Sequence, residues 1–173
     1  YEIVSIFFGG GTPSFVPFSE IAKTMELIHT HFPVAKDAEI TIECNPSSTM
    51  KLALLSYKRA GFNRISFGLQ SANDEELEFL GRTHRYLDFL KAYEDARLSG
   101  FNNISVDLMN GIPLQSPKSF QKSLKNISML RPEHLSIYNL IVEKGTRFFR
   151  MQEDGKLPLP SEEELLEMDS LSL

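Results

Sequence analysis

The stretch Lys51–Ser71, KLALLSYKRAGFNRISFGLQS, contains one complete helix-to-strand connection. Leu52 and Leu55 lie on one face of a helical segment that stops at Gly61, a residue suited to the left-handed conformation that ends many helices. A β-rich run, Arg64–Gly68, follows after a loop of ordinary length. A helix closed by glycine and followed at once by a strand is typical of an α/β fold.

The same unit recurs along the chain. Five strands are expected, at Ile3–Phe8, Glu39–Glu43, Arg64–Gly68, Ile104–Leu108 and His134–Ile141. Helical spacing between and after them predicts helices opening near Ser19, stopping at Gly61, around Leu77–Leu80, from Leu87 to Gly100, from Phe120 to Leu130, and from Glu162 with an acidic, solvated face. This alternation predicts parallel pairing, either in an open doubly wound sheet or in part of a (β/α) barrel.

Composition limits the class of protein. The 173 residues are 42% hydrophobic and carry 18 basic and 23 acidic side chains, a net charge of −5, which is ordinary for a globular domain. No basic run exceeds two residues, so we expect no nucleic-acid partner. No apolar stretch approaches the roughly 20 residues of a transmembrane helix. The lone Cys44, expected to be a buried thiol, excludes an internal disulfide, and no Cys/His cluster offers a metal site.

Polar residues stand where the predicted strands end. The first strand runs into a glycine loop and Thr12, and later strands end at or near Glu43, Gln70 and Asp107. Each residue alone has a structural explanation at least as good as a functional one. Because carboxyl ends of parallel strands share one edge, together they predict a pocket for a polar, zwitterionic or ribose-bearing small molecule. Arg82 lies between two helices and can pair with a carboxylate at that edge or with a neighbouring Glu.

No catalytic residue is predicted, because no serine or cysteine stands in a triad-like context with a histidine. Residues 1–150 are expected to form one core, truncated at its amino terminus, and residues 151–173 to begin a linker or C-terminal region. The chain opens at Tyr1 with a strand-like run and is therefore expected to be a fragment of a longer protein.

Seven motifs occur in a fixed order. They are FFGGGTPS (7–14), ECNP (43–46), NRISFGLQS (63–71), LGRTH (80–84), DLMNGIP (107–113), PEHLSIY (132–138) and EKGT (143–146). This set resembles the radical S-adenosylmethionine proteins related to oxygen-independent coproporphyrinogen III oxidase. Within that family it is most similar to the heme chaperone branch, the HemW type, and the likeness runs from about Ile3 to Met168.

The resemblance implies an incomplete (β/α)6 partial barrel that lacks its first strand and its cluster loop. It implies that S-adenosylmethionine is bound by the following residues of this sequence: Gly10, Gly11, Thr12, Glu43, Gln70, Arg82 and Asp107. The family's Cys-x-x-x-Cys-x-x-Cys loop, which holds a [4Fe–4S] cluster, does not occur in this stretch, and Cys44 cannot replace it. The complete protein is thus expected to bind the cluster, S-adenosylmethionine and heme.

Two functions follow from the resemblance, a heme chaperone that delivers heme to hemoproteins and an oxidative decarboxylase acting on coproporphyrinogen III. The decarboxylases resemble Gly-Val-Gln-Asp-Phe and Asp-Pro-Arg where this chain has Leu69-Gln70-Ser71 and Asn45-Pro46-Ser47, which favours the chaperone. A third interpretation is a cluster-less barrel that serves only as an interaction module. The chaperone would be cytoplasmic in a bacterium and mitochondrial in a eukaryote.

Overall fold

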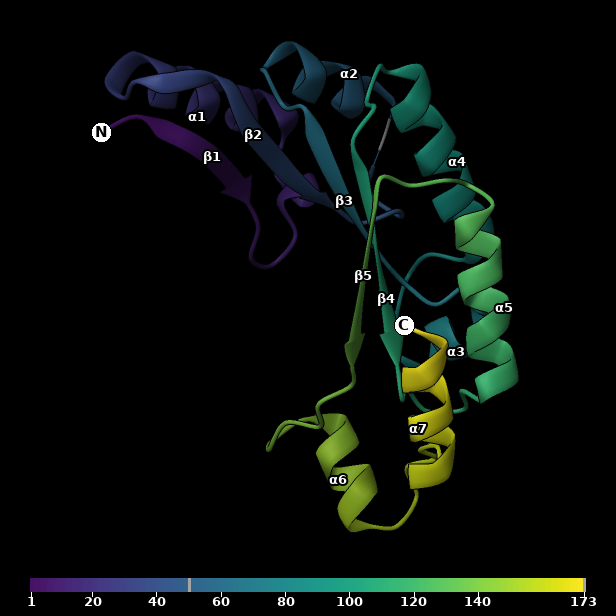
Figure 1. Cartoon of the computed structure of the whole chain (residues 1–173). Helices are drawn as coiled ribbons and strands as arrows, with labels where there is room; N and C mark the ends of the chain where they lie inside the picture. The colour runs from purple at the N-terminus through teal and green to yellow at the C-terminus, as the bar shows by residue number, and fades with distance from the viewer. Residues whose placement is uncertain (50, 173) are drawn as a thin grey trace. The chain divides into compact units, whose positions relative to one another are not determined.

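The computed structural model describes residues 1–49 and 51–172; Leu173, the end of the expected C-terminal region, lies outside the described residues. One five-stranded sheet has the order β1-β2-β3-β4-β5 (Figure 1). The strands are β1 (Ile3–Phe8), β2 (Val34–Cys44), β3 (Arg64–Gln70), β4 (Ile104–Asn110) and β5 (His134–Asn139). Neighbours in sequence are neighbours in the sheet, whereas a doubly wound sheet reverses its strand order at a switch point. The order therefore excludes the doubly wound alternative and agrees with a partial barrel.

The helices fall where the apolar spacing predicts them, with two differences. They are η1, a 3-10 turn (Pro13–Phe15), α1 (Phe18–His31), α2 (Lys51–Arg59), α3 (Asp74–Phe79), α4 (Tyr86–Leu98), α5 (Pro117–Ser128), α6 (Arg147–Glu153) and α7 (Glu162–Leu171). Gly61 and Gly100 have φ of +100° and +90°, so both predicted left-handed caps are confirmed. The short elements η1 and α6 were not predicted. No described helix is both long and apolar enough to cross a membrane.

Five strand boundaries differ from the prediction. β2 ends one residue later, at Cys44, and β3 and β4 each run two residues further, to Gln70 and Asn110. The second strand begins at Val34 rather than Glu39, because Val34 pairs with Ile3 across an irregularity in the β1–β2 ladder. Lys36 and Asp37 within this extension are polar and exposed, so an apolar pattern could not reveal it. The fifth strand ends at Asn139, two residues early, where the backbone N–H of Leu140 turns to the carbonyl of Asn110.

The chain forms two compact units. The first contains Tyr1–Leu69, Leu87–Val106 and Pro132–Leu135, and the second contains Gln70–Tyr86, Asp107–Arg131 and Ser136–Leu173. Boundaries between the units fall within β3, β4 and β5, so neither unit is one continuous stretch of the sequence.

The sheet of the first unit has one apolar and one polar set of side chains. Along β2, Ile40, Ile42 and Cys44 are buried, and they alternate with Glu39, Thr41 and Glu43. Along β3, the buried Ile65, Phe67 and Leu69 alternate in the same way with Arg64, Ser66 and Gly68. Since alternate residues of a strand face opposite sides, the apolar set packs under the helices and the polar set lines the other side. Thr41 and Ser66 of the polar set are themselves buried, so this side of the sheet is polar without being open to solvent throughout.

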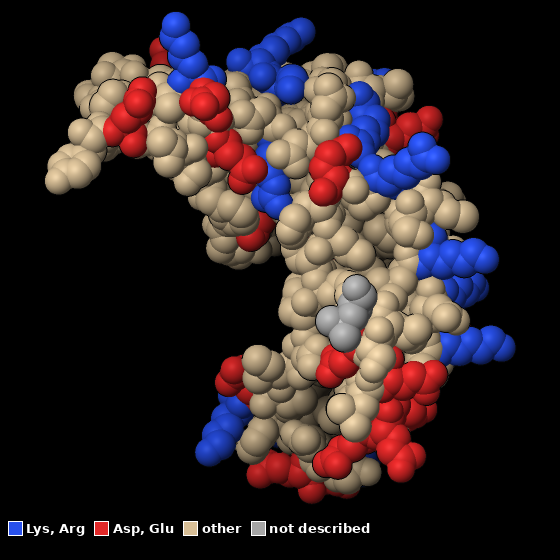
Figure 2. All heavy atoms as spheres, viewed as in Figure 1, with Lys and Arg blue, Asp and Glu red and all other residues tan. Residues whose placement is uncertain are grey.

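The second unit is built around the carboxyl-terminal end of β4. Leu108, Ile112, Phe120, Ile127 and Met168 have no exposed surface. Helix α7 packs beside α5 in this core (Figure 1). The Asn110 side chain donates to Asp169 of α7 at 2.7 Å. The outer face of α7 carries the acidic side chains expected there, and Figure 2 shows acidic residues gathered over this part of the surface.

Candidate functional site

The glycine loop, Gly9–Gly11, joins β1 to η1, and its backbone is open to solvent. Gly10 has a φ of +98°, a conformation that favours glycine. A side chain built at Gly10 or Gly11 would meet no atom within 4 Å. The Thr12 hydroxyl donates to the Gly11 carbonyl at 2.7 Å. A ligand could therefore approach the backbone of this loop closely.

Glu43 lies directly against the loop. A Cβ built at Gly9 would come within 3.0 Å of Glu43 Oε1 and within 2.6 Å of Cε1 of the Phe7 ring. Any larger residue at position 9 would displace one of these side chains. The structure thus brings together the glycine loop and Glu43, which the sequence placed at two separate strand ends.

A hydrogen-bond network ties the segment after β1 to the segment after β2. The buried Ser14 hydroxyl accepts from the Asn45 backbone N–H at 2.9 Å and shares a hydrogen bond of 2.8 Å with the Ser48 hydroxyl. The Thr49 hydroxyl donates to the Asn45 carbonyl at 2.7 Å. These contacts fix the two segments that carry Gly9 and Glu43. Ser14 ends the FFGGGTPS motif, but the sequence did not predict that it would join these two segments. That role depends on a partner 31 residues away.

Cys44 is a buried thiol, as expected. Burial raises its pKa to about 12, the neighbouring Glu43 charge adds to the rise, and a hydrogen bond with Thr49 opposes it. A thiol held in its protonated form is a poor metal ligand. Within the described residues, no group of three or more His, Cys, Asp or Glu side chains could hold a metal ion. The residues described here therefore do not fit an iron–sulfur cluster.

In the second unit, Gln70 ends β3 in an unusual conformation. Its φ is +75°, in the region that residues other than glycine rarely adopt. The Tyr138 hydroxyl, from β5, donates to Gln70 Oε1 at 2.7 Å. Tyr138 ends the PEHLSIY motif (132–138) but was not predicted to be a site residue. Its position near the end of a strand was the available signal.

Arg82 and Asp107 belong to the second unit as well. Arg82 is half-buried in the loop between α3 and α4; burial lowers the pKa of its guanidinium, and an electrostatic interaction with Tyr138 opposes that change. Asp107 is half-buried on β4 between the buried Val106 and Leu108. Together, Gln70, Arg82 and Asp107 provide a neutral donor and acceptor, a cation and an anion.

The described cavities do not coincide with these residues. A cavity of about 480 Å³ in the second unit is lined by residues including Asp74, Tyr86 and Lys122. A second, of about 450 Å³ in the first unit, lies between α1 and α2 and includes Phe18 and His29. Neither contains a residue that the sequence predicted for the site.

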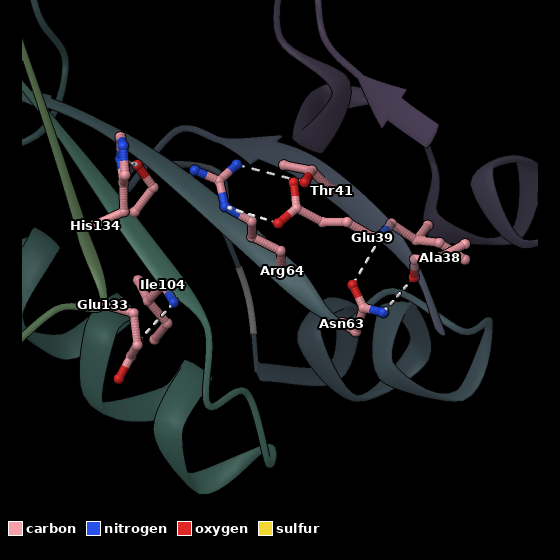
Figure 3. Close-up of polar contacts among 10 residues, drawn as sticks. Ala38, Glu39, Thr41, Asn63, Arg64, Ile104, Glu133 and His134 are labelled. Atoms are coloured by element: carbon pink, nitrogen blue, oxygen red, sulfur yellow. Dashed lines mark hydrogen bonds and ion pairs between the residues drawn. The ribbon is translucent and has the colours of Figure 1, made fainter. Parts of the chain in front are cut away.

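A different polar network joins the middle of β2 and the amino-terminal ends of β3 and β4 in the first unit (Figure 3). The Asn63 side chain accepts from the Ile40 N–H at 2.8 Å and donates to the Ala38 carbonyl at 2.7 Å. Arg64 contacts Glu39 at 3.9 Å. The Glu133 carboxylate accepts from the Ile104 N–H at 2.8 Å and from Arg97 at 2.9 Å. Nearly every partner here is backbone or an oppositely charged side chain, so this network joins strands to one another.

Known proteins match the chain over most of its length. The profile of the Radical SAM superfamily matches residues 1–127. The heme chaperone HemW of Bacillus subtilis is 39% identical over 168 residues, which are 96% of this chain and 44% of that protein. The mouse mitochondrial radical S-adenosyl methionine domain-containing protein 1 is 39% identical over 167 residues, 96% of this chain and 38% of that protein.

A solved structure confirms the architecture. Coproporphyrinogen III oxidase (HemN) from Escherichia coli, a radical SAM enzyme, superposes with a TM-score of 0.86 and 29% identity over 99% of this chain and 39% of its own. This likeness confirms the expected α/β partial barrel. The chain spans about two fifths of the length of these relatives. It belongs to the radical SAM superfamily, with HemW-type heme chaperones and the vertebrate mitochondrial protein among its relatives.

Proposed function

We propose that this chain is the S-adenosylmethionine-binding core of a heme chaperone of the HemW type, which binds heme and delivers it to hemoproteins. The observation that carries the proposal is its likeness to curated HemW chaperones. Those of Bacillus subtilis, Synechocystis and Escherichia coli are 36–39% identical over 85–96% of this chain. The oxidase structure that shares the fold is 29% identical.

The glycine loop and Glu43 of the first unit are suited to the ammonium group of S-adenosylmethionine. An ammonium group donates several hydrogen bonds and needs acceptors of negative or partial negative charge. The Glu43 carboxylate and the backbone of the glycine loop, held next to each other by the small size of Gly9, supply such acceptors. Gly10 and Gly11 leave the backbone accessible, and Thr12 adds a hydroxyl.

Three residues of the second unit, taken by themselves, also match chemical groups of S-adenosylmethionine. Arg82 is suited to a carboxylate, because its guanidinium can donate two parallel hydrogen bonds. Asp107 and Gln70 are suited to hydroxyl groups, which both donate and accept. S-adenosylmethionine, once bound, supplies a reactive sulfonium. Because the described residues offer no ligands for a [4Fe–4S] cluster, we propose that its ligands lie outside these 173 residues.

The second candidate function is the oxidative decarboxylation of coproporphyrinogen III. The close structural match to HemN favours it, since the two share their fold over almost the whole of this chain. The motif forms at Asn45-Pro46-Ser47 and Leu69-Gln70-Ser71 favour the chaperone instead. Only the second function forms protoporphyrinogen IX, so an assay for that product separates the two.

The test uses the full natural polypeptide, reconstituted anaerobically, with Escherichia coli HemN assayed in parallel. We expect the polypeptide to bind heme, to transfer it to a heme-free hemoprotein, and to leave coproporphyrinogen III unchanged. HemN, as the positive control, should form protoporphyrinogen IX under the same conditions. Formation of protoporphyrinogen IX by the polypeptide would overturn the chaperone proposal in favour of the oxidase.

Location and domain organisation follow the same proposal. The relatives include bacterial proteins and a mitochondrial one, so we propose the cytoplasm for a bacterial source and the mitochondrion for a eukaryotic one. We also propose that residues 1–150 form the ligand-binding core and that residues 151–173 lead into a C-terminal region.

A further inference from the structure

Gln70 and Tyr138 are 68 residues apart in sequence and are joined by one short hydrogen bond. The Tyr138 hydroxyl donates to the Gln70 carbonyl oxygen at 2.7 Å. Both residues belong to the second unit, each at the end of a strand. The bond uses the carbonyl oxygen of the Gln70 amide. The –NH2 group of the same amide is therefore the end directed away from Tyr138.

The Gln70 backbone is itself strained. At φ +75° a side chain with a Cβ costs free energy, and such conformations persist where the surroundings hold them. Tyr138 is one of the groups that hold Gln70.

A role in overall stability does not explain the contact well. Tyr138 is 43% exposed, and a hydrogen bond at such a surface position contributes little to folding. The core of the second unit is formed by other, fully buried side chains. What the bond does fix is the direction of one amide group at a strand end.

We propose that Tyr138 is a positioning residue for S-adenosylmethionine binding: it holds the Gln70 carbonyl so that the Gln70 –NH2 group is directed as a donor toward the ligand. This inference rests on the proposed function. It adds to that function a residue that does not itself bind the ligand and acts through Gln70 alone.

The test is a double-mutant cycle in the full natural polypeptide, with S-adenosylmethionine binding measured by calorimetry under anaerobic conditions. Tyr138→Phe keeps the ring and removes the hydroxyl, so we expect binding to weaken about 3- to 10-fold, the range for one lost hydrogen bond. Gln70→Ala should weaken binding at least as much. If Tyr138 acts through Gln70, adding Tyr138→Phe to Gln70→Ala should cause no further loss.

Tyr93→Phe is the matched control. The Tyr93 hydroxyl accepts a 2.6 Å hydrogen bond from Arg97 in α4, in the first unit, and its removal should leave S-adenosylmethionine binding unchanged. Additive losses in the double variant, or unchanged binding in Tyr138→Phe beside a loss in Gln70→Ala, would overturn the positioning role while the proposed function stands. A wild-type polypeptide that binds heme but no S-adenosylmethionine would overturn the proposed ligand site, and this inference with it.

Discussion

Asn63 and Gln70 carry side-chain amides at the two ends of β3, and the two amides have different hydrogen-bond partners. Asn63, just before the strand, bonds with both ends of its amide to the backbone of β2, at 2.8 and 2.7 Å. Gln70, the last residue of the strand, bonds through its carbonyl oxygen to one exposed tyrosine and adopts a strained backbone. An amide with both ends bonded to backbone joins strands, whereas one directed by a side chain is suited to a ligand.

The two carboxylates of β2 make the same contrast within the first unit. Glu39 and Glu43 project from the same side of the strand, four residues apart. Glu39, in the middle of the strand, forms a long ion pair with Arg64, the first residue of β3 (Figure 3). Glu43 lies at the carboxyl-terminal end against the glycine loop. Position along the strand, rather than residue type, separates the structural carboxylate from the one proposed to bind.

The largest expected effect on ligand binding comes from replacing these two carboxylates by amides, one at a time. Glu43→Gln removes the charge next to the loop and should weaken S-adenosylmethionine binding by about 1–3 kcal/mol, the range for hydrogen bonds to charged groups. Glu39→Gln, the matched control, should leave binding unchanged. Calorimetry on both variants measures the difference. Equal affinities for the two variants would remove the distinction between the middle of β2 and its carboxyl-terminal end.

The sequence predicted most of the fold because its signals are local. Helical spacing, the glycine caps at Gly61 and Gly100 and the apolar strand runs are each contained within about a dozen residues. Helix α6 was missed because it has only seven residues and none of them is buried, so it shows no apolar face. The extension of β2 was missed because pairing with Ile3, and not an apolar pattern, defines it.

The site was only partly predictable for a related reason. Each candidate residue could be recognised singly, from its place at a strand end. The contact of Gly9 with Glu43 and the bond from Tyr138 to Gln70 join residues 34 and 68 positions apart. No spacing rule within one sequence specifies such pairs, so these two partners were found only in the structure.

A smaller effect is expected from the structural amide, and it should appear in stability alone. Asn63→Ala removes two hydrogen bonds to the β2 backbone and should lower the free energy of unfolding by about 1–2 kcal/mol. S-adenosylmethionine binding to the folded protein should not change. Urea unfolding measures the loss, and Asn102→Ala, an exposed asparagine before β4, should stay within about 0.5 kcal/mol of wild type. Weakened binding in Asn63→Ala would mean that the two ends of β3 are not functionally separate.

The smallest effect concerns Glu133, which lies beside the amino-terminal end of β4. Burial raises its pKa, but hydrogen bonds from Arg97 and from backbone N–H groups, including that of Ile104, outweigh burial and leave the pKa below its ordinary value. A carboxylate with a lowered pKa stabilises the folded state above its unfolded pKa, about 4.3, and that stabilisation is lost as the pH falls through the lower, folded value. Because the Glu133 side chain is 41% exposed, solvent screening should keep its contribution below about 1 kcal/mol. Glu133→Gln should therefore reduce stability slightly at pH 7 and flatten its decline below about pH 4. Urea titrations of both proteins from pH 7 to pH 3 measure this, and parallel curves would show that the Glu133 charge does not stabilise the sheet.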